Sequence, residues 1–172
     1  MSSEQGPIIR ALAAADAEAY RAIRLEALRQ APDAFASSYE EESARPIETF
    51  GERLAGKFGG ITFGAIVDRE IAGTAGGVRE DRLKTNHKLL LVGVYVRAAH
   101  RGRGLGERLV ARVLQHAREL GDVRVVQLKV ACDNRAACAL YDRMGLTVYG
   151  IERKAIKLGE RFIDEELRAI EL

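Results

Sequence analysis

The sequence feature that most constrains how this chain can fold is a glycine-rich loop between a strand-like and a helix-like segment. The loop reads Arg-Gly-Arg-Gly-Leu-Gly over residues 101–106 and follows the apolar run "LVGVYV" at residues 91–96. Beyond it, Leu105, Leu109 and Val113 recur at helical spacing. The first amides of a helix have no carbonyl partners inside it and carry the positive end of its dipole. Glycines at that point let the backbone approach a bulky anion, so the loop indicates a phosphate site.

Two common phosphate-binding motifs do not match this loop. A P-loop requires Gly-Lys followed by Ser or Thr, and the loop has no such triplet. The dinucleotide fingerprint requires its third glycine one residue later, where Glu107 stands. A plain strand-to-helix turn, whose glycines only relieve crowding, is as well supported by the loop alone as an anion site.

The hydrophobic period changes repeatedly along the chain, which predicts an α/β (α+β) domain built on one sheet. The expected strands are Ile8–Ala11, 60–67, 71–79, 88–96, 123–130 and a final pair joined near Gly159-Glu160. The expected helices begin at Asp16, near Pro46, at Leu105 and near Arg135, and a further short one begins at a capping box of Ser37 with Glu40 or Ser38 with Glu41.

Composition excludes several classes of protein. The chain has 172 residues, of which 30% are charged and 47% hydrophobic, so we expect a single domain over residues 1–172 with a full-sized core. A net charge of +2 provides no bulk basic field for nucleic acid. No apolar run is long enough for a membrane span and no signal peptide is recognisable, which predicts a cytoplasmic protein without a membrane partner. Cys132 and Cys138 are expected to be free thiols, and no metal site is predicted.

Two sequence blocks together resemble one superfamily. Arg101, Gly104 and Gly106 form the spacing Arg-x-x-Gly-x-Gly directly after a strand, and "LKVACDNRAACALYDRMGL" follows at residues 128–146. Both are similar to the GNAT superfamily of acetyl-CoA-dependent N-acetyltransferases. The resemblance implies the GNAT fold: a central mixed, mostly antiparallel sheet of six to seven strands, about four helices, and fourth and fifth strands that splay apart.

The resemblance also implies acetyl-CoA as the acetyl donor, without a metal. The pantetheine arm would lie between the splayed strands and pair with the main chain, and Gly93 would form a bulge beside it. The pyrophosphate would bind the amides of the glycine loop. The implied cofactor-binding residues are Val94, Tyr95, Val96, Arg101, Gly102, Arg103, Gly104, Leu105, Gly106 and Asn134.

By the same resemblance, Tyr141 is the general acid that protonates the departing CoA thiolate. Seven residues make nearly two helical turns, so Asn134 and Tyr141 should share one face about 10 Å apart along the axis. The alternative for Tyr141 is a core aromatic with a satisfied hydroxyl. Cys138, between them, is interpreted as a small apolar spacer because no activating base accompanies it.

The general base is not assigned by the resemblance. Some members carry a strand glutamate at positions that here hold Lys88 and Lys129. Other acidic side chains expected near the acceptor, none assigned as catalytic, are Glu40, Glu41, Glu42, Asp164 and Glu165. Capping and solvation are their ordinary roles, but at the acceptor site they would favour a cationic amine.

The predicted function is transfer of acetyl from acetyl-CoA to a primary amine of a small molecule or peptide, by direct attack. The alternative is a non-catalytic acyl-CoA sensor or regulatory module on the same fold, and a weaker one is a nucleotide-binding regulator. Acceptor specificity should lie in residues 31–58 and in the last hairpin, and the exposed C-terminal strand leaves a homodimer open.

Overall fold

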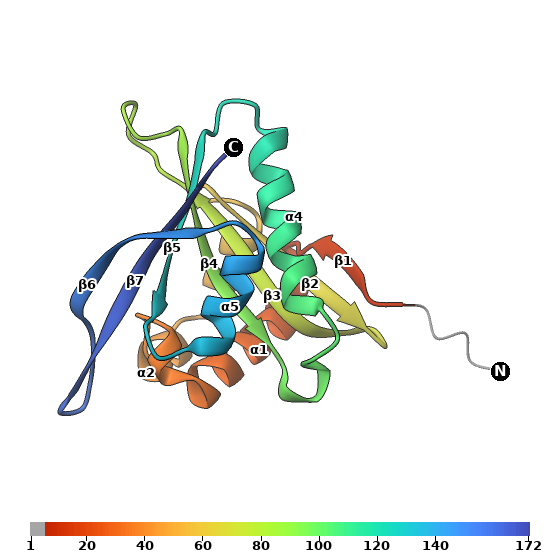
Figure 1. The fold of residues 1–172 in the computed structure, drawn as a ribbon. Helices are drawn as coiled ribbons and strands as arrows, with labels where there is room; N and C mark the ends of the chain where they lie inside the picture. The colour runs from red at the N-terminus through yellow and green to blue at the C-terminus, as the bar shows by residue number, and fades with distance from the viewer. Residues whose placement is uncertain (1–5) are drawn as a thin grey trace.

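In the computed structural model, which describes residues 6–172, one seven-stranded sheet carries helices on both faces (Figure 1). The strands are β1 (Ile8–Ala11), β2 (Gly60–Val67), β3 (Glu70–Arg79), β4 (Lys88–Val96), β5 (Val125–Ala131), β6 (Thr147–Leu158) and β7 (Arg161–Glu171). The helices are α1 (Ala17–Gln30), α2 (Tyr39–Ser43), α3 (Ile47–Leu54), α4 (Leu105–Glu119) and α5 (Arg135–Arg143).

The strand order is β1-β2-β3-β4-β5-β7-β6, in which only β4 and β5 run parallel within the described residues. The predicted mixed, mostly antiparallel sheet is therefore confirmed, with five α-helices where about four were expected. The short helix is α2. It begins at the second of the two expected capping boxes, where the Glu41 amide donates to Ser38 Oγ at 3.1 Å and the Ser38 amide donates to Glu41 Oε2 at 2.9 Å.

Two local predictions need correction. Asp16 is the residue before α1, but its carboxylate does not cap that helix; it accepts from the Ala13 amide at 2.8 Å and pairs with Arg10. The strands expected at 60–67 and 71–79 left three residues for the hairpin turn, but β3 begins at Glu70 and the turn consists of Asp68 and Arg69 alone. Their φ angles are 48° and 68°, and two left-handed residues match the twist of the flanking strands.

Separate apolar cores fill the two faces of the sheet. On one face α4 and α5 lie side by side (Figure 1), and Leu109 and Val113 of α4 are fully buried against the strands. On the other face Ile23 of α1 and Phe50 of α3 pack against β3 and β4. Helical spacing of apolar residues places each set on one side of its helix, which is why both helix layers attach to the sheet.

Gly93 forms the predicted bulge in β4. Tyr95 lies opposite Thr74 and Val92 opposite Gly76, so Gly93 and Val94 together face a single residue of β3. Gly93 has a φ of 63°, a conformation that favours glycine. One extra residue reverses the alternation of side chains beyond it. Val94 consequently packs on the α4 side of the sheet, whereas Tyr95 joins the core beneath α1 and α3.

The β6–β7 hairpin extends beyond the rest of the sheet, and β6 is its edge strand (Figure 1). Val148, Tyr149 and Ile151 of β6 are exposed. A homodimer through this edge stays a prediction. None of the helices in residues 6–172 has the length and apolar character that crossing a bilayer requires.

Candidate active site

A narrow cleft opens where β4 and β5 separate. Their parallel pairing covers only residues 88–90 of β4 and 125–127 of β5, so the later residues of the two strands do not pair with each other. The cleft of about 80 Å³ is lined by Val94, Asn134 and Tyr141 among others. Three residues predicted to contact the cofactor or the leaving group are therefore brought together, although they come from two separate sequence blocks.

The glycine loop lies at the beginning of α4, beside the C-terminal end of β4 (Figure 1). Gly102 and Gly104 have φ angles of 75° and 73°, and a Cβ on either would meet no atom within 4 Å. At the N-terminus of this 15-residue helix, the backbone of these two glycines is therefore left-handed and open to an approaching ligand. The first amides of the helix have no partners within it and face outward. Gly106 is different, because it packs against Leu140 of α5.

The side chain of Arg101 folds back onto β4. Its Nε donates to the Val96 carbonyl at 2.9 Å, and its guanidinium carbon lies 5.7 Å from the Tyr95 ring centroid. Arg101 thereby shapes the loop, whereas Arg103 is exposed. The side chain of Tyr95 points away from the cleft and donates to Glu26 Oε1 at 3.1 Å, so only its main chain could serve a ligand between β4 and β5.

Tyr141 is 6% exposed and lines the cleft from α5. Within the described residues its hydroxyl makes no hydrogen bond to protein, unlike the satisfied hydroxyl of an ordinary core tyrosine. Burial raises the pKa of the Tyr141 phenol well above its usual value of 10. The phenol is protonated at neutral pH, as any tyrosine of ordinary pKa is, and burial strengthens this preference.

Asn134 and Cys138 occupy the same helix as Tyr141. Asn134 Oδ1 caps α5 by accepting from the Ala137 amide at 3.2 Å, which leaves its NH₂ group for other partners. Cys138 directs its sulfur toward the Ala131 carbonyl, 3.8 Å away, and burial raises the pKa of its thiol. A thiol with a raised pKa is a poor nucleophile, which agrees with its interpretation as a spacer.

A second, larger cavity of about 390 Å³ lies on the other side of β4. Val92 and Gly93 line both this pocket and the cleft, so the two spaces meet at the β4 bulge. The polar side chains of the pocket come from α1, from the segment after it and from β2. They include Tyr20, Arg24, Ser37, Glu42, Arg45, Thr49, Arg53 and Thr62. We call this cavity the acceptor pocket.

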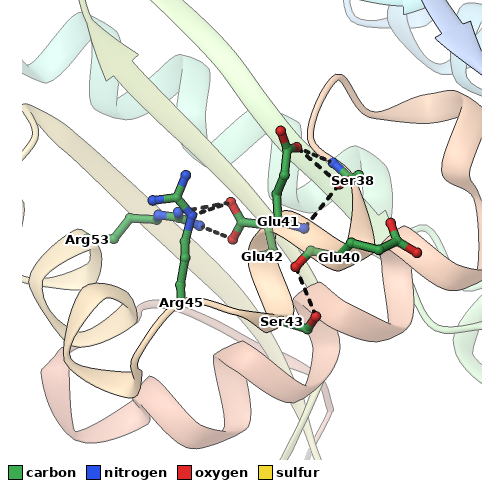
Figure 2. A network of polar contacts seen from close by, with 7 residues as sticks. All are labelled: Ser38, Glu40, Glu41, Glu42, Ser43, Arg45 and Arg53. Atoms are coloured by element: carbon green, nitrogen blue, oxygen red, sulfur yellow. Dashed lines mark hydrogen bonds and ion pairs between the residues drawn. The ribbon is translucent and has the colours of Figure 1, made fainter.

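The three consecutive glutamates near α2 have different roles (Figure 2). Glu40 is exposed, and the Glu41 carboxylate is held in the capping box of Ser38, which lowers the pKa of Glu41. Glu42 is 3% exposed, lines the acceptor pocket and accepts two hydrogen bonds from Arg53 at 3.1 and 3.2 Å. Of the three, only Glu42 faces the pocket.

The acidic residues of the last hairpin lie outside the acceptor pocket. Asp164 pairs with Arg153 and accepts from the Lys154 amide at 2.8 Å, and these bonds lower its pKa. Glu165 is buried, which raises its pKa. Among the described residues the hairpin contributes no side chain to the lining of this pocket, and its part in specificity stays a prediction.

The lysines at the usual glutamate positions do not replace a base. Lys129 is half-exposed and its Nζ lies 2.6 Å from Glu152 Oε2. Lys88 stands at the beginning of β4, where that strand still pairs with β5. Within residues 6–172, no three metal-ligating side chains come together.

Sequence reasoning missed Arg24, Arg53 and Phe35. Arg24 follows Tyr20 by four residues and so lies on the same face of α1 as the buried Tyr20 and Leu28. A charged residue on an apolar face was the signal available. Arg53 and Phe35 lie in the stretch 31–58 that was expected to hold specificity, but no motif marked them.

Two cavities thus adjoin at the β4 bulge, and comparison with known proteins gives the family. The profile of the acetyltransferase (GNAT) family matches residues 20–146. The chain belongs to this family. A phosphinothricin acetyltransferase from Sinorhizobium meliloti, solved in complex with acetyl-CoA, has the same fold with a TM-score of 0.82, 18% identity and coverage of 98% of this chain and 89% of that one.

Two curated acetyltransferases match parts of the sequence. A mycothiol acetyltransferase of Corynebacterium glutamicum is 47% identical over 51 residues, 30% of this chain and 17% of that protein. An L-methionine sulfoximine/L-methionine sulfone acetyltransferase of Salmonella typhimurium is 32% identical over 80 residues, 46% of each chain. The matched parts span less than half the length of either relative.

Proposed function

We propose that the protein transfers the acetyl group of acetyl-CoA directly to a primary amine. The observation that carries this proposal is the meeting of the cleft and the acceptor pocket at Val92 and Gly93. A thioester in the cleft and an amine in the pocket would approach each other there without a covalent enzyme intermediate. One curated relative is named for the acetylation of L-methionine sulfoximine and L-methionine sulfone, and both of these compounds carry a primary amine, which supports an amine acceptor.

The residues around the cleft suit acetyl-CoA. The unhindered backbone at Gly102 and Gly104 and the outward amides of α4 would bind the pyrophosphate. The edge of β4 that faces β5 has no strand partner beyond residue 90 and would pair with the pantetheine arm, and Asn134 would donate its free NH₂ group. When bound, acetyl-CoA supplies a thioester whose carbonyl carbon accepts the amine.

The chemistry follows from the protonation states. An alkyl ammonium has a pKa of about 10, so the amine must lose a proton before its nitrogen can attack. The first proton leaves the ammonium for solvent water before attack, because no unpaired carboxylate lines the described pocket. The carbon–nitrogen bond then forms, the carbon–sulfur bond breaks, and the Tyr141 hydroxyl donates its proton to the leaving sulfur. The second N–H proton, which the nitrogen loses as the amide forms, restores the Tyr141 phenol through solvent water.

Calorimetric titration with acetyl-CoA, CoA, ATP and NAD, followed by thiol release with a panel of amines, tests this function. Binding of acetyl-CoA and CoA, together with amine-dependent release of CoA, is the expected result. Binding without release would favour the sensor, a reading that Lys88 and Lys129 at the usual glutamate positions support. Binding of ATP or NAD in place of acetyl-CoA would overturn the interpretation of the loop.

A further inference from the structure

The acceptor pocket contains an arginine without a partner. The Nε atom of Arg24 is buried and has no hydrogen-bond partner, and its guanidinium forms no ion pair within residues 6–172. The guanidinium carbon lies 4.9 Å from the Phe35 ring centroid, so one planar face rests on an aromatic ring. Burial lowers the pKa of Arg24. A half-buried guanidinium whose Nε lacks a partner carries an unfavourable desolvation cost, which an anion bound in the pocket would offset.

The other charges of the pocket do not compensate Arg24. Glu42 is the single carboxylate of the described lining, and Arg53 already binds both of its oxygens at 3.1 and 3.2 Å. Arg45 approaches the same carboxylate at 3.6 Å, as Figure 2 shows. Three guanidinium groups therefore face one carboxylate, and the lining has an excess of positive charge.

This excess reverses an expectation from the sequence. If Glu40, Glu41 and Glu42 all faced the acceptor, they would favour a cationic molecule. Only Glu42 does, and two arginines neutralise it. A molecule whose sole charge is positive would meet like charge in this pocket, which is unfavourable at short range.

Arg24 lies close to the place of reaction. Phe35, on which its guanidinium rests, lines the cleft, whereas Arg24 itself lines the acceptor pocket. The two cavities meet at Val92 and Gly93. An anion bound by Arg24 would thus sit beside the junction, and an amine a few bonds from that anion would reach the cleft.

We infer that the acceptor pocket selects a small amine that also carries a carboxylate, as a free amino acid does, and that Arg24 binds this carboxylate. The planar guanidinium presents two parallel donors, which suit a carboxylate better than an uncharged amide. A cavity of about 390 Å³ suits a ligand of this size. The inference rests on the proposed acetyl transfer for its chemistry but not for the binding itself.

The first test measures binding alone. In the presence of CoA, the protein is titrated calorimetrically with L-methionine sulfone, L-alanine, L-phenylalanine and L-aspartate, and with the α-carboxamide of each. We expect at least one acid to bind about ten- to a hundredfold more tightly than its carboxamide, the range for a hydrogen bond to a charged group. If no acid in the set is preferred to its carboxamide, the inference is overturned.

Variants of α1 assign the effect to one residue. Arg24→Gln should remove the preference for the acid, and Arg24→Lys, which keeps the charge but not the fork of donors, should retain part of it. The matched control is Arg29→Gln, on the same helix but outside the pocket, where the guanidinium lies over the Tyr39 ring. Arg29→Gln should bind as the wild type does. Loss of the preference in the control but not in Arg24→Gln would overturn the assignment.

Thiol release with the same compounds separates the two proposals. If carboxamides and acids are acetylated with equal kcat/KM, and Arg24→Gln changes neither, the carboxylate site is wrong although acetyl transfer stands. If acids bind through Arg24 but no amine releases CoA, acetyl transfer is wrong although the carboxylate site stands. Both proposals hold if the acids are acetylated faster than their carboxamides and Arg24→Gln removes the difference.

Discussion

At the residue scale, the proposed chemistry depends on one hydroxyl. Tyr141 lines the cleft with no protein partner for its hydroxyl among the described residues, and its phenol is protonated at neutral pH. Tyr141→Phe removes only that oxygen, so we expect kcat to fall by about 10²- to 10⁴-fold while the Kd for acetyl-CoA changes less than twofold. Steady-state kinetics and calorimetry measure the two quantities. Tyr149→Phe, an exposed tyrosine on β6, is the control, and an unchanged kcat in Tyr141→Phe would remove its role as acid.

The second prediction concerns Asp16, whose carboxylate makes the stability of the fold depend on pH. Hydrogen bonding by Arg10, helped by the Ala13 amide, lowers the pKa of Asp16 to about 2, whereas an unfolded aspartate titrates near 3.9. Asp16 therefore stabilises the fold above about pH 4, and this contribution is lost as the pH falls towards 2. We expect the difference in free energy of unfolding between wild type and Asp16→Asn to shrink across that window in urea titrations. The matched control is Asp81→Asn, in an exposed loop.

At the element scale, the loop before α4 holds a glycine in the left-handed conformation and is the proposed binding site for the pyrophosphate of acetyl-CoA. Gly104→Ala introduces a side chain at a φ of 73° with no neighbour within 4 Å, so its structural cost is conformational, about 1–2 kcal/mol of unfolding free energy. Because the amides of this loop would bind pyrophosphate, acetyl-CoA affinity should fall as well. Urea titration and calorimetry measure the two effects.

Gly121 provides the matched control at the far end of α4. It has a φ of 76° and equally open surroundings, so Gly121→Ala should cost a similar free energy of unfolding and leave acetyl-CoA affinity unchanged. If both variants weakened binding equally, general destabilisation would explain the loss, and the loop would not be the pyrophosphate site.

At the scale of the whole molecule, Arg168 connects the helix of the site to the sheet. It is 3% exposed on β7 and donates to Asp142 of α5 at 2.6 Å, to Glu166 at 2.7 Å and to the Leu146 carbonyl at 3.0 Å. We expect Arg168→Met to lower the free energy of unfolding by about 1–3 kcal/mol, since Asp142 can return to water but the Leu146 carbonyl loses its buried donor.

Chemical denaturation measures this effect, and Lys157→Met, on the exposed part of the β6–β7 hairpin, is the control expected to stay within 0.5 kcal/mol. Because Arg168 holds α5 against β7, its loss should also weaken acetyl-CoA binding through displacement of Asn134 and Tyr141. A variant with wild-type stability would show that α5 is held by its apolar contacts alone.

The sequence by itself determined most of the elements and the order of the two motif blocks, because periodicity, glycine positions and capping residues act over a few neighbouring residues. The bulge at Gly93 was implied by the family resemblance. The same local rules predicted that Asn134 and Tyr141 share a face, and both line the cleft. Membership of the GNAT family followed from motifs that are short and contiguous.

Only the tertiary structure decided which polar side chains meet. Local rules do not distinguish Glu41, which caps α2, from Glu42, which pairs with Arg53 eleven residues later. Nor could they reveal that Arg24, which shares the buried face of α1, has no hydrogen-bond or ion-pair partner, because that depends on α1, α2, α3 and β4 packing around one cavity. The net charge of a site is the sum of the charged side chains that segments distant in sequence contribute, and only folding brings those segments together.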